Sequence, residues 1–173
     1  GVEDVPVDVR QRAVEALVEA GQRAEDRELH AHARRVYGQL LTLVGTEPSP
    51  ERRHALVGRA IAACALHDDA TAEADVEAVE VEARDAGDDV VLARAFTVRG
   101  DLARNRGDFT TSLRYLEEAV ALWRAAGNRR GEASALRRIG WTKLFAGDLA
   151  GAEPVMLEAL AAFREAGASR GEA

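Results

Sequence analysis

The side chains that could do chemistry in this sequence are four histidines, one cysteine and several clustered carboxylates. His30 and His32 are two residues apart, so on a helix they point in different directions and chelate a metal ion poorly. The run HDDATAEAD at 67–75 is explained by a turn and a first helical turn, where carboxylates cap the helix and complement its dipole. Cys64 lies in an alanine-rich stretch, where no histidine–carboxylate pair argues for a nucleophile, as expected of a packed thiol. No Gly-rich phosphate loop occurs. We therefore predict no catalytic residue, no metal and no cofactor.

The arginine pairs 129–130 and 137–138 form a basic run that could contact nucleic acid. Glu132 interrupts them, and the whole chain has a net charge of −7 and a pI of about 5.2. An acidic domain is a poor binder of phosphate backbones. We predict a solvated helix start here, and no nucleic-acid partner.

Composition indicates a globular chain of 173 residues, with 47% hydrophobic and only 5% aromatic residues. No apolar run approaches the roughly 20 residues of a membrane helix, and a single cysteine excludes an intrachain disulfide. We expect a cytoplasmic protein with no membrane partner. Lys143 is the only lysine, an arginine bias that indicates a GC-rich bacterial genome.

An internal repeat organises the chain. The dipeptides at 67–68, 107–108 and 147–148 are His-Asp, Gly-Asp and Gly-Asp, at steps of 40 residues. Small residues recur with nearly the same step at Gly21, Ala60, Gly100 and Gly140. The spacing predicts four units at about 8–47, 48–88, 89–128 and 129–168. Residues 169–173 repeat the start of the fourth unit, so we expect them to begin a truncated fifth one.

Each unit contains two apolar patterns of helical spacing. We predict N-caps at Ser49, Asp108, Asn128 and Asp148, and helix C-termini at Gly87, Gly127 and Gly167. The repeated small residues are expected to be notches in the first helix of each pair, facing Ala33, Ala72, Ser112 and Ala152 on the second. The prediction is an all-α fold of eight helices in four hairpins.

The segments GDFTTSLRYLEEAVAL and GDLAGAEPVMLEAL resemble the tetratricopeptide repeat. The 40-residue period is similar to the long variety in C-terminal arrays of bacterial signalling proteins, such as nucleotide cyclases and ATPase-type regulators. The resemblance covers the last two units well, the second moderately and the first weakly. His67 and Arg99 depart from the motif. The resemblance implies a right-handed α-solenoid, with a concave groove formed by the first helices.

Carried onto this sequence, the resemblance places a set of first-helix side chains in that groove. The candidates for binding are His54, Val57, Ile61, Arg94, Arg104, Arg137 and Trp141. Such a face could bind an extended peptide or a helix. The alternative is that Val57, Ile61 and Trp141 are core between the repeats, and the sequence leaves both open.

Two functions follow. The first is a non-catalytic protein–protein interaction or regulatory module of a larger bacterial signalling protein, whose partner could be another domain of the same parent chain. The alternative is a sensor that binds a short peptide or a small anionic ligand in the groove. We also expect an apolar patch at Met156, Leu160 and Phe163, left uncovered by the missing fifth unit, to support self-association.

Overall fold

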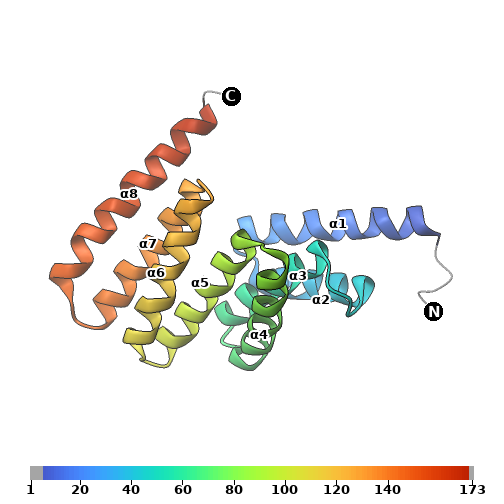
Figure 1. Cartoon of the computed structure of the whole chain (residues 1–173), viewed down its shortest axis with the longest axis horizontal. Helices are drawn as coiled ribbons and strands as arrows, with labels where there is room; N and C mark the ends of the chain where they lie inside the picture. The colour runs from blue at the N-terminus through green and yellow to red at the C-terminus, as the bar shows by residue number, and fades with distance from the viewer. Residues whose placement is uncertain (1–5, 172–173) are drawn as a thin grey trace. The chain divides into compact units, whose positions relative to one another are not determined.

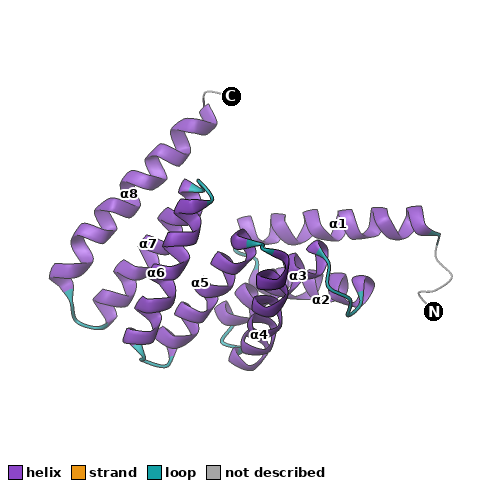
Figure 2. Ribbon diagram, in the orientation of Figure 1, coloured by secondary structure: helices purple, strands orange, loops and turns teal. Residues whose placement is uncertain are grey.

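The computed structural model describes residues 6–171, and within that range every regular element is a helix (Figure 2). The expected all-α fold of paired helices is confirmed. The eight helices of the described range are α1 (Val7–Asp26), α2 (His30–Val44), α3 (Pro50–Ala65), α4 (Asp69–Ala86), α5 (Asp89–Asn105), α6 (Phe109–Ala125), α7 (Arg129–Phe145) and α8 (Leu149–Gly171).

The chain divides into two compact units, with the boundary between Ala86 and Gly87. The first unit contains α1–α4 and the second contains α5–α8 (Figure 1). In the second unit each helix packs against the next, and α5 also contacts α7. In the first unit α1 contacts both α2 and α3.

Polar N-caps begin several helices, as the sequence predicts. The side chains of Ser49, Asp108, Asn128 and Asp148 each accept a hydrogen bond from the backbone N–H three residues later. Each bond satisfies one of the donors that a helix N-terminus leaves unpaired. Asp108 and Asp148 cap the second helix of a hairpin in this way, and Ser49 and Asn128 cap the first.

The turn before each second helix needs a residue in the left-handed region. Gly107 and Gly147 have φ values of 79° and 83° there. His67 occupies the equivalent turn with φ of 57°, a conformation that a non-glycine residue rarely adopts. The departure from the repeat at His67 therefore changes the residue and keeps the turn.

The sequence predicts a helix end at Gly167, but α8 continues through this residue to Gly171. The expected fifth unit at 169–173 ends in residues 172–173, which lie outside the described part of the chain.

The repeated glycines are notches, and what fills them differs from the prediction. A Cβ atom built on Gly100 would lie 2.6 Å from Leu116 Cγ, and one on Gly140 would lie 2.8 Å from Met156 Cγ. At Gly21 the neighbour is the ring of Tyr37, at 2.4 Å. The notch thus receives a large side chain of the second helix.

The small residues expected to face the notches still have a packing role. Ala33, Ala72, Ser112 and Ala152 are all buried. Each lies four residues, about one helical turn, before a large side chain of the same helix. Three of those side chains, Tyr37, Leu116 and Met156, enter the notches, and the fourth is Val76 on α4. Small residues at this turn let the two helices approach closely enough for the large side chain to enter.

A buried carboxylate joins three helices of the second unit. Glu132 on α7 is 1% exposed, and it accepts hydrogen bonds from Arg124 on α6 and from Arg129. The same two arginines bind Glu158 and Glu165 on α8. Burial acts to raise the pKa of Glu132, but the hydrogen bonds and charges of the two arginines outweigh it and lower the pKa.

In the first unit, the ring of Tyr37 is fully buried between two glycines, Gly21 on α1 and Gly58 on α3. Beside this core, Arg59 forms two hydrogen bonds of 2.7 and 2.6 Å with the buried carboxylate of Asp75 on α4. An aromatic core and a bidentate ion pair therefore connect the four helices of this unit.

We predict that Gly100→Ala destabilises the protein by roughly 1–3 kcal/mol, because the new Cβ overlaps Leu116 and forces the hairpin apart. Gly38→Ala is the matched control, since a Cβ there has no neighbour within 4 Å. It should stabilise by about 0.5–1 kcal/mol, the usual gain of Gly→Ala in a helix. Urea unfolding followed by circular dichroism measures both, and equal effects of the two substitutions would count against the notch.

A second prediction concerns acid. Hydrogen bonds from the hydroxyl and backbone N–H of Thr111 lower the pKa of Asp108, and the N–H of Gly151 with the Lys143 ammonium lowers that of Asp148. A carboxyl group with a lowered pKa in the folded state contributes stability that is present above its unfolded pKa, about 4, and is lost as the pH falls through the folded value. We expect the free energy of unfolding to be nearly constant from about pH 7 to 5 and to fall below about pH 4.

The double variant Asp108→Asn/Asp148→Asn removes the two titrating groups. It keeps side chains that can cap the two helices, because asparagine already does so at Asn128. Its loss of stability below about pH 4 should be shallower than that of the native protein. Unfolding curves measured across this pH range test the point. An unchanged pH dependence in the double variant would show that the caps do not contribute to it.

Candidate functional site

The second unit has a hollow of about 370 Å³ between α5 and α7 (Figure 1 shows the two helices). Its lining comes from six side chains: Asp101, Arg104, Arg137, Arg138, Trp141 and Phe145. The volume is in the range of small-ligand and peptide side-chain pockets. Because both helices are first helices of their pairs, the hollow lies on the face that the sequence analysis predicts to bind.

One stripe of α7 supplies the cationic and aromatic side of the hollow. Arg137, Trp141 and Phe145 follow each other at steps of four residues, so they lie on one face of the helix. Trp141 is 46% exposed and Phe145 is 63% exposed. Their ring centroids are 6.2 Å apart. Two large aromatic side chains in contact with each other are thus left open to solvent beside an arginine.

Asp101 orders the opposite side of the hollow. Its carboxylate accepts a hydrogen bond of 2.6 Å from Arg104 and one of 2.9 Å from Nε of Arg138. Arg138 also donates to the hydroxyl of Ser134, at 2.7 Å. Two of the three guanidinium groups are therefore held in fixed positions by one carboxylate.

Arg137 is the remaining cation. It is exposed, and it forms no ion pair within the described part of the chain. Three guanidinium groups against one carboxylate leave the hollow with a surplus of positive charge. The arrangement suits a group that is anionic at one end and apolar at the other, because arginine binds carboxylate and phosphate oxygens and the aromatic faces bind apolar groups.

The structure brings three of the seven predicted groove residues together. Arg104, Arg137 and Trp141 line the hollow, while Arg94 lies further along α5, partly buried and outside the lining. Trp141 is 46% exposed, so it is open to solvent and is not core between repeats.

The other three predicted residues lie on α3 in the first unit. Val57 is fully buried, so a ligand cannot reach it, and here the core alternative is correct. Ile61 is partly buried, and His54 packs edge-on against Tyr37 with ring centroids 5.6 Å apart. These three positions therefore do not form an open surface on α3.

Three residues of the hollow, Asp101, Arg138 and Phe145, are not among the seven candidates. Arg138 reaches it because its long side chain extends to Asp101 from a position beside Arg137. Phe145 follows Trp141 by four residues, and that spacing was a usable signal.

The three residues of the predicted association patch differ in exposure. Met156 fills the notch at Gly140 and is partly buried against α7. Leu160 is 45% exposed and Phe163 is half-buried. Leu157, which was not predicted, is 60% exposed on the same helix.

The described residues offer no sign of other chemistry. Among the described side chains, no three His, Cys, Asp or Glu residues are placed to hold a metal ion. Cys64 is buried. None of the helices in the described range has the length and apolar character needed to cross a bilayer.

Comparison with known families agrees with the repeat. Residues 91–165, which include most of α5–α8, match the family model described as tetratricopeptide repeat. The match supports assignment to a tetratricopeptide-repeat family. Helical repeats of this type are generally non-catalytic. A search of curated proteins found no match to the chain.

We predict that Asp101→Ala lowers the free energy of unfolding by about 1–2 kcal/mol, because it removes two hydrogen bonds to charged, largely buried groups. Arg137→Ala should change it by less than about 0.5 kcal/mol, since Arg137 has no partner to lose within the described chain. Both tryptophans, Trp123 and Trp141, lie in the second unit, so urea unfolding followed by their fluorescence reports on it. Equal losses for the two variants would contradict the distinction between held and available arginines.

Proposed function

We propose that this chain is a non-catalytic protein–protein interaction or regulatory module that binds a peptide segment of its partner in the α5–α7 hollow. Tetratricopeptide repeats generally mediate protein–protein interaction, which supports the general part of the proposal. The proposed binding site rests on the second unit, which contains both the residues that match the family and the α5–α7 hollow.

The observation that supports this function best is the exposed stripe of Arg137, Trp141 and Phe145. Exposed aromatic and arginine side chains are the residue types that dominate binding energy at protein interfaces. Asp101 fixes Arg104 and Arg138 beside them, so much of the site is ordered before a ligand arrives and less entropy is lost on binding. The segment that fits has a leucine-like or aromatic side chain for the rings and an acidic side chain for Arg137.

The proposal also concerns the kind of protein in which this module would occur. The resemblance to long 40-residue repeats favours a cytoplasmic bacterial signalling protein, in which the module controls a catalytic part outside these residues. The partner could then be another domain of the parent chain. Such a partner would be present at high effective concentration, so modest affinity for a single peptide would suffice.

The alternative is a sensor for a short peptide or a small anionic ligand. The three guanidinium groups around the hollow favour it, because they supply more positive charge than one peptide carboxylate needs. The two functions differ in what the aromatic stripe does. A small anion needs the arginines alone, whereas a peptide segment of a partner needs both.

A fluorescent peptide that alternates leucine with glutamate tests the proposal by anisotropy. We expect Arg137→Ala and Trp141→Ala each to weaken its binding about tenfold, equivalent to about 1.4 kcal/mol. Arg114→Ala is the matched control, because Arg114 is an exposed arginine on α6 paired with Glu118, away from the hollow. Equal affinity of all four proteins for the peptide would disprove the site.

Two further peptides separate the alternatives. Replacing glutamate by lysine should abolish binding, because the hollow repels a cation. Replacing leucine by glycine should also abolish binding if the aromatic stripe is used. If the glycine peptide and inorganic phosphate bind as well as the parent peptide, the sensor for a small anion is correct and the interaction module is not.

A further inference from the structure

An exposed stripe on α4 in the first unit has the charge and the apolar character that the α5–α7 hollow would bind. Glu77, Val81 and Asp85 follow each other at steps of four residues, so they lie on one face of the helix. All three are exposed, and Val81 is 57% exposed. Neither carboxylate has an ion pair or a hydrogen bond within the described part of the chain. These three residues, called the α4 stripe below, thus present an apolar side chain between two unpaired carboxylates.

The stripe and the hollow come from the most acidic and the most basic of the eight described helices. α4 contains seven carboxylates and one arginine, whereas α7 contains one carboxylate and five basic residues. The arginine of α4, Arg84, donates to Glu80 at 3.2 Å, so it leaves the charges of Glu77 and Asp85 unneutralised. Attraction between surfaces of opposite charge speeds their encounter and orients them.

The repeat does not require either surface. Forty and eighty residues after Val81 the repeat has Ala121 on α6 and Ala161 on α8, and both are exposed. Forty residues before Trp141 it has Asp101 on α5. The fold therefore accepts small or polar residues at these positions, and packing does not explain a large apolar side chain exposed at either one.

We propose that the α4 stripe of a second copy of this chain is the segment that docks in the α5–α7 hollow. The inference rests on the function proposed above, because it names the partner of the same site. In this complex Val81 packs on the rings of Trp141 and Phe145, and a carboxylate of the stripe pairs with Arg137, as an amphipathic helix does in a groove. Because a carboxylate stands on each side of Val81, the pairing is available in both directions of the docked helix.

Val81 differs from the other exposed apolar side chains in its neighbours. Of the exposed large apolar residues in the described range, Val81 alone has a carboxylate four residues away on both sides. Leu157 on α8 is 60% exposed, but it has Glu153 on one side and Ala161 on the other. A hollow with an arginine beside aromatic rings therefore favours the α4 stripe over the apolar face of α8.

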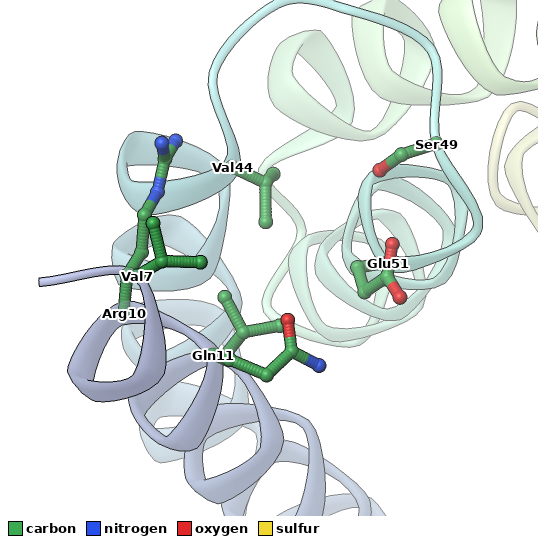
Figure 3. A pocket seen from close by; sticks show the side chains of 7 residues that line it. Val7, Arg10, Gln11, Val44, Ser49 and Glu51 are labelled. Atoms are coloured by element: carbon green, nitrogen blue, oxygen red, sulfur yellow. The ribbon is translucent and has the colours of Figure 1, made fainter.

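The first unit has a hollow of its own, of about 320 Å³, where α1 begins, α2 ends and α3 begins (Figure 3). Its described lining contains no aromatic side chain, and its arginine, Arg10, donates to the carbonyl of Leu43 at 2.8 Å. Glu51 also lines it and would repel a carboxylate. We therefore expect the acidic stripe in the α5–α7 hollow and not in this one.

Sedimentation of the full chain over a range of concentrations tests the inference. We expect the native protein to self-associate, and Val81→Arg and Trp141→Ala each to weaken association by about tenfold or more, since one adds a repelled cation and the other removes a ring. Val90→Arg is the matched control, because Val90 is an exposed valine on α5 without a carboxylate four residues away. It should associate like the native protein.

Mixing the two defective proteins gives the decisive result. Val81→Arg keeps an intact hollow, and Trp141→Ala keeps an intact α4 stripe. An equimolar mixture should therefore associate about tenfold more tightly than either variant alone. Circular dichroism verifies that each variant is folded. If the mixture of two folded variants associates no better than each alone, the stripe and the hollow do not meet and the inference is overturned.

The peptide that alternates leucine with glutamate separates this inference from the proposed function. Dissociation of the assembly by the peptide supports both. A peptide that binds a native protein which stays monomeric overturns the second copy and leaves the interaction module. Association that Leu157→Arg abolishes, and that Val81→Arg and Trp141→Ala leave unchanged, overturns the inference in favour of the α8 face. If the peptide does not bind and the chain stays monomeric, both proposals are wrong.

Discussion

The fold of three of the four hairpins depends on one kind of contact, a large side chain of the second helix set into a glycine of the first. Leu116 over Gly100 and Met156 over Gly140 are the same contact 40 residues apart. The close approach that it permits buries the small residues one turn earlier, including Ser112 and Ala152, which are both fully buried. Packing at this density leaves little room for added atoms, so the glycine and its partner constrain the whole pair.

Close packing of α5 through α8 also determines where charge can be placed. Burying Glu132 is tolerable only because two arginines neutralise it, and those arginines reach on to α8. On the α5–α7 face the balance is reversed, since one carboxylate, Asp101, serves two arginines and a third stays exposed. The second unit is therefore ion-paired where its helices meet and cationic where its surface is hollowed. A surface of that kind favours anionic partners in rate of encounter as well as in affinity.

Sequence alone predicts most of the fold, because the repeat appears in residues with local physical roles. The caps at Ser49, Asp108 and Asn128 are read from side-chain chemistry that acts within three residues. The site is predicted only in part, since a groove side chain is defined by distant neighbours. Val57 and Trp141 look alike as apolar first-helix residues, yet one is fully buried and the other is 46% exposed. The difference comes from what packs on each helix in the fold, which no short-range pattern indicates.

The two units also show how a repeat keeps its fold while its surfaces change. An indole at position 123 requires glycine at 131, because any Cβ there would overlap the ring. Val44 is the residue that aligns with Trp123 in the repeat, and with valine there the restriction is lifted, so that Glu51 can stand where the repeat places Gly131. In the second unit, a larger residue at 131 would overlap the indole, and a smaller one at 123 would leave an unfilled space. The helix pair is the same in both cases, so specificity can vary at the first turn of a helix while the glycine notches hold the architecture constant.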